Sequence, residues 1–512
     1  MSKIYNITII GAGLGGLAVA CRLAKLGHKV TIIEQNKQVG GKASELFIDG
    51  FRFDRGPSFM TMIDIFEDLF NFCGARLLDY IPYKGLDETV EYHWPDKTQI
   101  TAYQDLDKTV QALCDHHGED KKTIQNYLSK IKLVYDLSKP YALDKAIDFT
   151  QIFNPDFLKT AFKLSGLGLN GSLARVHSKV FSNPKSLNIF NRWAAYVYSD
   201  PYKTPSILGS VGWAELGLGL YLPTHGIHSI ATGIARLAKE LGVKIILDTK
   251  VVGLEQLPDK SWQYDTISLN GRLESNTAEI LISNLDIRTT YKHLLKTDYP
   301  TAKKTGGSYL IYYWGIKYHP KLAGLKLHNI FFGDNSGNPL GDKAEFIEQF
   351  DQGKVPENPM VYLNITSGLI EADSPIIDGQ KSQNWIVIIS TPPDNDKINW
   401  ANELTSKKTY IAKLIAKSLE IDPSELLDLI VCQKIITPPD IQDWTGSYNG
   451  DLSGMRIESI WDVLSRPKVK SPNFDNLYFV GGSINPGPGM PMVLLSAKHC
   501  VEEVLKNAKL LY

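Results

Sequence analysis

The amino-acid sequence predicts an α/β fold in which parallel strands alternate with helices. A run rich in β-branched residues at 4–10 enters a glycine-rich turn and precedes a helix-patterned segment at 17–27. A second strand-like run at 476–480 also leads into glycines and then a helix, expected from about Val493 to Leu505. The chain has 512 residues, which is too long for one core, so two or more domains are expected.

The N-terminal segment has the pattern of a dinucleotide-binding βαβ unit. Its glycine turn spans Gly11 to Gly16, and the next strand-like run, 28–34, ends at Glu34. Gly11 suits a tight turn, Gly13 lets a pyrophosphate approach the backbone, and Gly16 lets the helix pack closely on the strand. The pyrophosphate is expected at the positive helix N-terminus, with Glu34 accepting hydrogen bonds from the ribose. An acid there disfavours NADP, but the unit alone leaves NAD and FAD open.

The segments beyond this unit extend the cofactor prediction. The glycine pair at 40–41 permits close backbone passage beside an extended cofactor, and Arg55 can neutralise a phosphate. The alternative role for Arg55 is a surface salt bridge. Near the C-terminus, the loop 481–492 opens a helix whose free N–H groups can stabilise negative charge on a reduced flavin.

Composition narrows the class of protein. The net charge of -1 gives no electrostatic case for nucleic acid. No uncharged apolar run reaches the length of a membrane-spanning helix, and the N-terminus lacks a signal-peptide pattern. Five separated cysteines without a CxxC motif fit a reducing compartment. We therefore expect a cytoplasmic protein that is soluble or peripherally membrane-associated.

Motifs across nearly the whole chain resemble the FAD-dependent carotenoid desaturase family, of the bacterial phytoene desaturase type. The resemblance lies in GAGLGGLAVACRLAKLGHKVTIIEQNKQVGGKA at 11–43, FDRGPS at 53–58 and NLYFVGGSINPGPGMPMVLLSAK at 476–498. It implies a flavin amine-oxidase-like architecture. It also implies that FAD is bound by Gly11, Gly13, Gly15, Gly16, Glu34, Gly41, Lys42, Arg55, Gly56, Pro57, Val251, Val252, Gly481, Gly482, Met490, Pro491 and Met492.

A narrower resemblance is to the hydroxyneurosporene dehydrogenase branch, the 1-hydroxycarotenoid 3,4-desaturases. It lies in FNRWAAY at 190–196 and SDPYKTP at 199–205. The chain departs from the family pattern at Asn485 and Trp213, where histidines are usual, and at 224–226, where the family has a double glycine. These departures bear on the exact substrate and reaction.

The resemblance divides the chain into two discontinuous domains. A Rossmann-type FAD-binding domain is expected from residues 1–75, 215–290 and 470–512, and an inserted α+β substrate domain from 76–214 and 291–469. In the second domain, 308–316 and 384–391 have strand patterns, 105–150 has a helix pattern, and 333–358 has a loop composition.

The chemistry implied by the resemblance is desaturation. A hydride passes from an allylic carbon of a lipophilic polyene to FAD, and the neighbouring carbon loses a proton. An apolar tunnel is expected to hold the polyene, because each buried CH₂ contributes about 0.8 kcal/mol. Arg192, Tyr196 and Glu215 are the candidate catalytic residues, since they can meet a terminal hydroxyl; their alternative role is a buried structural ion pair. Oxygen and a membrane quinone both fit as electron acceptor.

Other functions remain open on the same fold. They are a carotenoid cis–trans isomerase, a carotenoid oxidase or ketolase, an amine oxidase, and a flavoprotein that only binds carotenoid. No HExxH, CxxC or GxSxG motif is present, so neither a metal site nor a serine nucleophile is expected.

The segment 157–192 contains no acidic residue and interleaves basic with apolar side chains. This pattern predicts contact with an anionic membrane surface, where each cation contributes about 1 kcal/mol. The alternative is an ordinary pair of amphipathic helices whose lysines face water.

Overall fold

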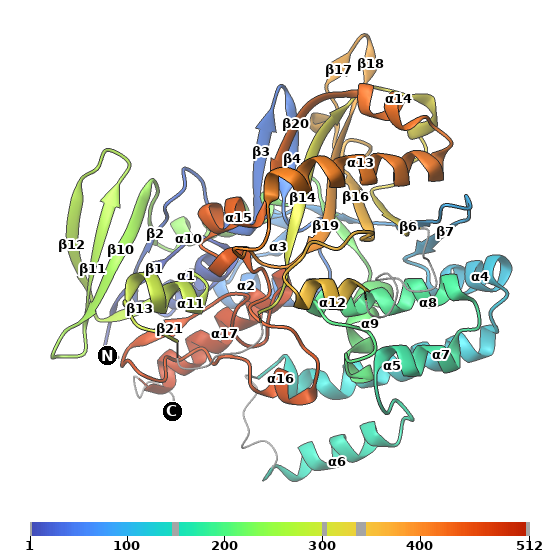
Figure 1. Cartoon of the computed structure of the whole chain (residues 1–512). Coiled ribbons are helices and arrows are strands. Elements are labelled where there is room, and N and C mark those ends of the chain that lie inside the picture. The colour runs from blue at the N-terminus through green and yellow to red at the C-terminus, as the bar shows by residue number, and fades with distance from the viewer. Residues whose placement is uncertain (1–2, 146–152, 300–304, 334–344, 508–512) are drawn as a thin grey trace.

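Two sheets organise the structure (Figure 1). The computed structural model describes residues 3–145, 153–299, 305–333 and 345–507. The first sheet is five-stranded and the second is seven-stranded. Helices flank both, which confirms the predicted α/β class.

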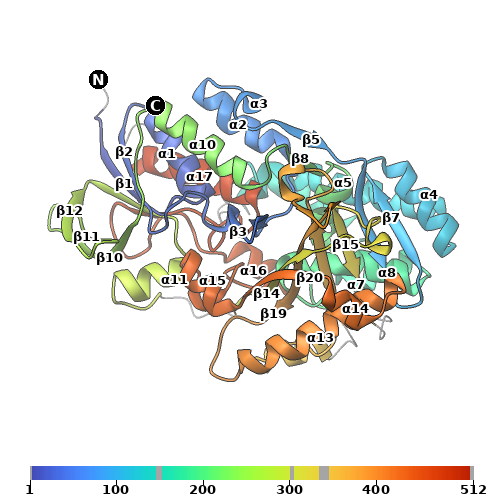
Figure 2. The same ribbon diagram turned by 90° about the horizontal axis from the view of Figure 1, so that it is seen from above.

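The first sheet is parallel and collects strands from both ends and the middle of the chain. Its order is β21 (Leu477–Phe479), β13 (Ile280–Ser283), β1 (Asn6–Ile10), β2 (Lys29–Ile33) and β9 (Lys244–Ile246). On one face, α1 (Leu14–Lys25) packs against both α10 (His228–Glu240) and α17 (Met490–Asn507) (Figure 2). Strand β1 is buried on both sides because it lies at the centre of the sheet, and Ile7, Thr8 and Ile9 are at most 1% exposed. The Rossmann-type fold is thereby confirmed; the domain boundaries stay a prediction.

An antiparallel meander covers the other side of this sheet. It comprises β10 (Thr249–Gln256), β11 (Trp262–Ser268) and β12 (Leu273–Ala278). The Thr8 hydroxyl of β1 donates to the Tyr264 hydroxyl of β11 at 3.4 Å, which joins the meander to the sheet.

The second sheet is mixed, and its two faces belong to two different hydrophobic core clusters. Its order is β20 (Ile430–Ile436), β14 (Ser308–Ile316), β19 (Gln383–Thr391), β16 (Val361–Ile365), β15 (His328–Phe331), β6 (Glu88–His93) and β7 (Gln99–Tyr103). Leu310, Tyr312 and Trp314 form one face and pack with residues of α13 (Trp400–Leu419). Side chains alternate along a strand, so Tyr309 and Tyr313 belong to the opposite face.

Helices of the segment predicted to form a substrate domain gather at the lower right of Figure 1, below this sheet. They are α4 (Leu106–His117), α5 (Lys121–Ala142), α7 (Leu173–Val180), α8 (Pro184–Asn191) and α9 (Ser210–Leu216). Helix α6 (Pro155–Ser165) projects away from the body and buries none of its residues. Among the described residues, no helix is both long enough and apolar enough to cross a membrane.

Two elements differ from the sequence prediction. The stretch 333–358 was expected to form loops, yet its described part contains α12 (Glu345–Asp351). Phe346, Ile347 and Phe350 recur at helical spacing, a signal that flanking glycines and prolines obscure. Helix α17 begins at Met490, three residues before the expected start, because Pro491 is tolerated in a first helical turn.

Candidate active site

The glycine turn brings α1 and β1 into closer contact than any side chain would permit. Gly11 has φ +96°, and a Cβ added at Gly16 would lie 2.1 Å from the Gly11 carbonyl oxygen. The first turn of α1 carries no acidic residue, and its N-cap, Gly13, makes no side-chain cap. The helix therefore presents free N–H groups and a positive end, which suits a pyrophosphate.

Asn284, at the end of β13, closes this turn from above. With its amide oriented to donate to the Val480 carbonyl at 3.2 Å, its oxygen accepts from the Gly13 N–H at 3.2 Å. A Cβ at Gly13 or Gly15 would lie 2.6 or 2.7 Å from this amide. Sequence reasoning missed Asn284 because it enters the site only through the β1–β13 pairing.

Glu34 follows β2 and is almost fully buried at 4% exposure. Its carboxylate accepts from the Ala12 N–H at 2.7 Å and from the N–H and side chain of Asn36 at 2.9 and 2.7 Å. A carboxylate accepts about four hydrogen bonds, so one lone pair remains for a ribose hydroxyl. The Glu34 carbonyl accepts from Thr249 at 2.9 Å, and a β-bulge just beyond leaves Val252 unpaired while Val251 pairs.

The residues after the βαβ unit surround the turn with positive charge. Gly41, at φ +54°, would place a Cβ 3.4 Å from the Gly13 Cα, and Gly56 packs against the Lys42 carbonyl. Burial lowers the pKa of Lys42, despite the opposing effect of two distant carboxylates, and lowers the pKa of Arg55. Arg55 stacks over Trp444 at 3.6 Å, and its buried Nε has no hydrogen-bond partner.

Neither Lys42 nor Arg55 forms an ion pair within the described part of the chain. The surface salt bridge considered for Arg55 is absent there. Both cations are half-buried and lack an acidic partner, so an anionic group is the partner that this geometry suits. The residues present thus fit a dinucleotide pyrophosphate. Pro57 continues the same half-buried segment toward Ser58.

The C-terminal loop completes the cofactor side of the site. Gly481, at φ +123°, donates its N–H to the Ser496 hydroxyl at 3.0 Å, and Gly482 packs near Pro488. Met490, Pro491 and Met492 form the first turn of α17, which has no acidic residue. The start of α17 lies beside that of α1, because a Cβ at Gly15 would lie 3.1 Å from Val493.

A separate polar cluster lies between the second sheet and α9. Arg192 forms an ion pair with Glu215, and the Tyr196 hydroxyl donates to the same carboxylate. Arg192 also donates to Tyr196 at 3.2 Å and to the Tyr92 hydroxyl at 2.8 Å. The structure therefore brings the three predicted catalytic residues together and adds Tyr92.

This cluster is buried except at Tyr196. Arg192 and Glu215 are 5% and 4% exposed, whereas Tyr196 keeps 37% of its surface accessible. Burial opposes the charge of Arg192, but Glu215 more than offsets this and raises the pKa of Arg192 well above its usual value. Burial and the nearby carboxylate raise the pKa of the Tyr196 hydroxyl. The cluster thus contains a neutral phenol on a residue that is partly exposed.

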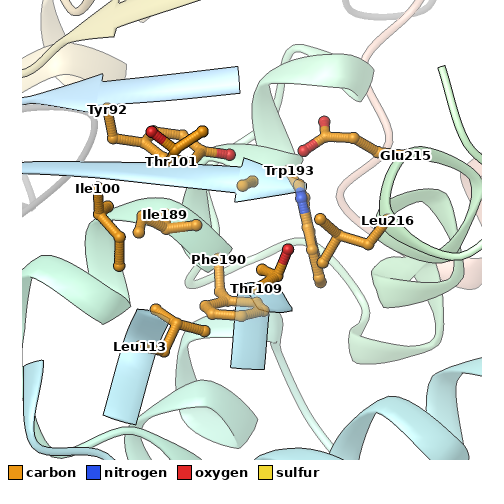
Figure 3. Close-up of a pocket in the computed structure, with 11 residues that line it drawn as sticks. Tyr92, Ile100, Thr101, Thr109, Leu113, Ile189, Phe190, Trp193, Glu215 and Leu216 are labelled. Carbon is orange, nitrogen blue, oxygen red and sulfur yellow. The ribbon is translucent and has the colours of Figure 1, made fainter. Parts of the chain in front are cut away.

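Figure 3 shows the pocket on one side of Glu215, with Trp193 and Leu216 beside it and Ile100 and Leu113 at the far end. Its lining is mostly apolar, and it has room for about one water molecule. This pocket is too small for a polyene, so a substrate would have to approach the cluster from the Tyr196 side.

Sequence reasoning missed a second polar group beside this cluster. The Tyr362 hydroxyl lies 2.5 Å from the Ser58 hydroxyl and 2.7 Å from His328 Nδ1. Burial, and secondarily Arg192, lowers the pKa of His328 to about 3, so the ring is neutral. His328 Nε2 and Arg192 Nε are both buried without a hydrogen-bond partner. These side chains come from β15, β16 and the segment after β4 (Phe51–Arg55), and only the sheet register unites them.

No group of three or more His, Cys, Asp or Glu residues suited to a metal ion occurs in the ranges that the structure covers. The site therefore combines a two-helix anion cradle with a buried polar cluster in an apolar setting.

Comparisons with known proteins agree with this combination. The profile of an NAD(P)-binding Rossmann-like domain matches residues 9–75. A 1-hydroxycarotenoid 3,4-desaturase of Flavobacterium sp. (strain P99-3) is 35% identical over 96% of this chain and 97% of its own length. A 4,4'-diaponeurosporene oxygenase of Staphylococcus aureus (strain MRSA252) is 28% identical over 98% of both chains. A solved putrescine oxidase covers 99% of this chain and 100% of its own at 13% identity, with a TM-score of 0.58, which shows the fold alone.

Fold and site together define a flavin-dependent oxidoreductase with a flavin amine-oxidase-like architecture. The chain belongs to the FAD-dependent carotenoid desaturase family.

Proposed function

We propose that the protein binds FAD and introduces the 3,4-double bond of a 1-hydroxycarotenoid. One observation carries this proposal: an Arg192–Glu215–Tyr196 cluster is buried in a largely apolar setting, and Tyr196 alone of its members keeps 37% of its surface accessible. A hydrocarbon polyene offers nothing for such groups to bind, whereas a tertiary hydroxyl does. The 35% identity to a desaturase of that substrate class supports the same choice.

The cofactor would lie along the cradle already described. Gly11, Gly13, Gly15 and Gly16 leave room for its pyrophosphate, Glu34 receives a ribose, and the bulge at Val252 leaves backbone groups for the adenine. When bound, FAD supplies two-electron oxidation by accepting a hydride from an allylic carbon. Lys42 and Arg55 would stabilise the negative charge of its phosphates. The first turn of α17 would stabilise negative charge on the reduced flavin ring.

The protein's own contribution is binding and orientation. Tyr196 and the unpartnered His328 Nε2 can hydrogen-bond a substrate hydroxyl and so fix which carbons meet the cofactor. Two C–H bonds break and one C=C bond forms, because a hydride leaves one carbon and a proton leaves its neighbour. The proton leaves to a base or to water, and oxygen or a quinone would reoxidise the cofactor.

The test uses FAD-loaded protein with phytoene, lycopene and a 1-hydroxycarotenoid in liposomes, followed by absorption and product mass. We expect a red shift and loss of two hydrogens only with the hydroxylated substrate. Tyr196→Phe, which keeps the ring, should lower kcat/KM for that substrate by about tenfold or more. Equal turnover of all three carotenoids would contradict the 3,4-desaturase assignment.

An oxygenase is the second candidate, because the Staphylococcus aureus relative aligns over 98% of both chains. The same assay separates the two, since an oxygenase product gains oxygen. A product of unchanged mass would indicate an isomerase.

We also propose that the protein associates peripherally with an anionic membrane, from the cytoplasmic side. Helix α6 exposes Leu158 and Phe162 at 54% and 81%, and Phe153 just before it is 80% exposed. Lys159 and Lys163 lie on the same exposed helix. Of the predicted segment 157–192, α6 is the part with an unpacked apolar face, whereas α7 and α8 contribute to the core.

A further inference from the structure

Arg466 is a buried arginine without an acidic partner. It is 6% exposed, and it forms no ion pair in the described ranges. Its Nη1 donates to the carbonyls of Ser453 and Gly482 at 2.9 and 3.2 Å, and its Nη2 donates to the Met455 carbonyl at 3.3 Å. A guanidinium bonded only to backbone oxygens keeps its full positive charge inside the protein.

The charged groups around Arg466 do not cancel that charge. Asp451 is the nearby carboxylate, but it accepts a hydrogen bond from Arg288 at 3.0 Å. Arg288 also donates to both carboxylate oxygens of Asp286. Lys42 faces the same two carboxylates without an ion pair. Both carboxylates are already bonded to Arg288, so neither pairs with Arg466.

Arg466 remains protonated at neutral pH. Burial lowers its pKa to about 10, with Arg288 adding to this effect and Asp451 opposing it. The uncompensated charge is therefore permanent under ordinary conditions. Such a buried charge indicates an anionic partner. A bound group would supply that negative charge, either on binding or during the reaction.

Arg466 lies directly under the loop that opens α17. It holds the Gly482 carbonyl near the start of the loop, and a Cβ at Gly487 would lie 3.3 Å from its Cζ. This is the loop to which the flavin ring is assigned above. Sequence reasoning missed Arg466 because the motif that it supports begins only ten residues later, at Asn476.

We propose that Arg466 tunes the flavin by holding its reduced form as an anion. Hydride uptake leaves the ring with one negative charge, and a fixed nearby cation favours that form over one that takes up a second proton. The two electrons come from the substrate C–H bond, and the substrate's second proton goes to a base or to water. Arg466 acts through its charge and touches no reacting atom. The proposal rests on the proposed cofactor placement but not on the substrate.

The experiment is a reductive titration of FAD-loaded protein with dithionite near neutral pH. The slope of the midpoint potential against pH counts the protons taken up per electron. We expect one proton per two electrons in the wild type and the spectrum of an anionic reduced flavin. Arg466→Met should lower the potential and double the slope, whereas Arg466→Lys should keep the wild-type slope.

A second variant changes the charge in the opposite direction. Asp451→Asn removes a carboxylate and should raise the potential, and it carries the test should Arg466→Met not fold. Arg456→Met is the matched control, because Arg456 is equally buried but paired with Asp351 at 2.6 Å, and it should leave the slope unchanged.

Unchanged potential and slope in Arg466→Met and Asp451→Asn would overturn the proposal. So would a loss of FAD affinity alone, since it would assign Arg466 to the phosphates or to folding. The titration needs no carotenoid, so a wrong substrate assignment would not affect it. A wild-type chain without bound FAD would overturn both the cofactor assignment and this proposal.

Discussion

The glycine turn and the Arg192–Glu215 cluster place functional groups in opposite ways. In the turn, the absence of side chains lets backbone atoms meet, and its tightest contact joins Gly16 to Gly11. In the cluster, opposite charges from η3 (Arg192–Val197) and α9 compensate one another in a buried position. The first region depends on space and the second on charge balance, so the two should fail differently when altered.

The largest effect is expected from filling the glycine turn. Gly16→Val would place side-chain atoms about 2 Å from a backbone oxygen that cannot move without displacing β1. The cost should exceed about 4 kcal/mol, and no flavin-bound protein should accumulate. The flavin absorbance of purified protein measures this.

Gly324→Ala is the matched control. A Cβ there meets nothing within 4 Å and the backbone has no positive φ, so flavin content should not change. A Gly16→Val protein with full flavin would show that close packing does not govern this region.

The second effect tests charge balance. Glu215→Leu leaves Arg192 buried without its partner and should lower the free energy of unfolding by about 3–5 kcal/mol. The double variant Arg192→Met/Glu215→Leu removes both charges and should recover much of that loss. Urea unfolding measures both. A double variant that is no more stable than Glu215→Leu alone would contradict compensation.

The same difference explains what the sequence could predict. The cofactor turn was readable because Gly11, Gly16 and Glu34 lie within one βαβ unit, where each role follows from local spacing. Arg192, Tyr196 and Glu215 were predicted through the resemblance and because their polar groups can meet a terminal hydroxyl. His328 and Tyr362 were not found, because only the pairing of β15 with β16 brings them together.

Other missed residues follow the same physical rule. Asn284 and Arg466 act on the cofactor loops through contacts made after the chain has folded. A polar residue at the end of a buried strand, such as Asn284 after β13, is a signal that could have indicated the first. No local pattern indicates that Arg466 would be buried without an acid.

The third effect is a loss of folding stability at low pH, which depends on where the buried histidines lie. Burial lowers the pKa of His117, His177 and His499 to about 4 and that of His328 to about 3. Below pH 6.5 the unfolded chain therefore binds protons that the folded chain refuses, and stability falls by about 1.4 kcal/mol per pH unit for each group. Burial raises the pKa of Asp54 to about 6. The folded chain therefore takes up a proton there as the pH falls, which offsets the destabilising effect of one of the four histidines.

Three of these histidines lie outside the parallel sheet and its helices, so acid should weaken the substrate region first. Urea unfolding between pH 7 and 4.5 measures the total slope, and amide hydrogen exchange in α4 and α7 follows the region around the second sheet. His117→Gln should reduce the slope by about 1.4 kcal/mol per pH unit, while the same change at its exposed neighbour His116 should not. Equal slopes in the two variants would refute the assignment.

The smallest effect on stability is expected at α6, which belongs to neither region. Phe162→Ser removes an apolar group that is 81% exposed, so the free energy of unfolding should change by less than about 0.5 kcal/mol. Binding to anionic vesicles should nevertheless weaken, and Lys159→Glu/Lys163→Glu should weaken it further and make it insensitive to salt. Phe47→Ser, at a similarly exposed ring on β3 (Ser44–Ile48), is the control for co-sedimentation. Equal sedimentation of all variants would show that α6 does not contact the membrane, whereas a loss confined to the α6 variants would separate the surface that collects substrate from both regions that process it.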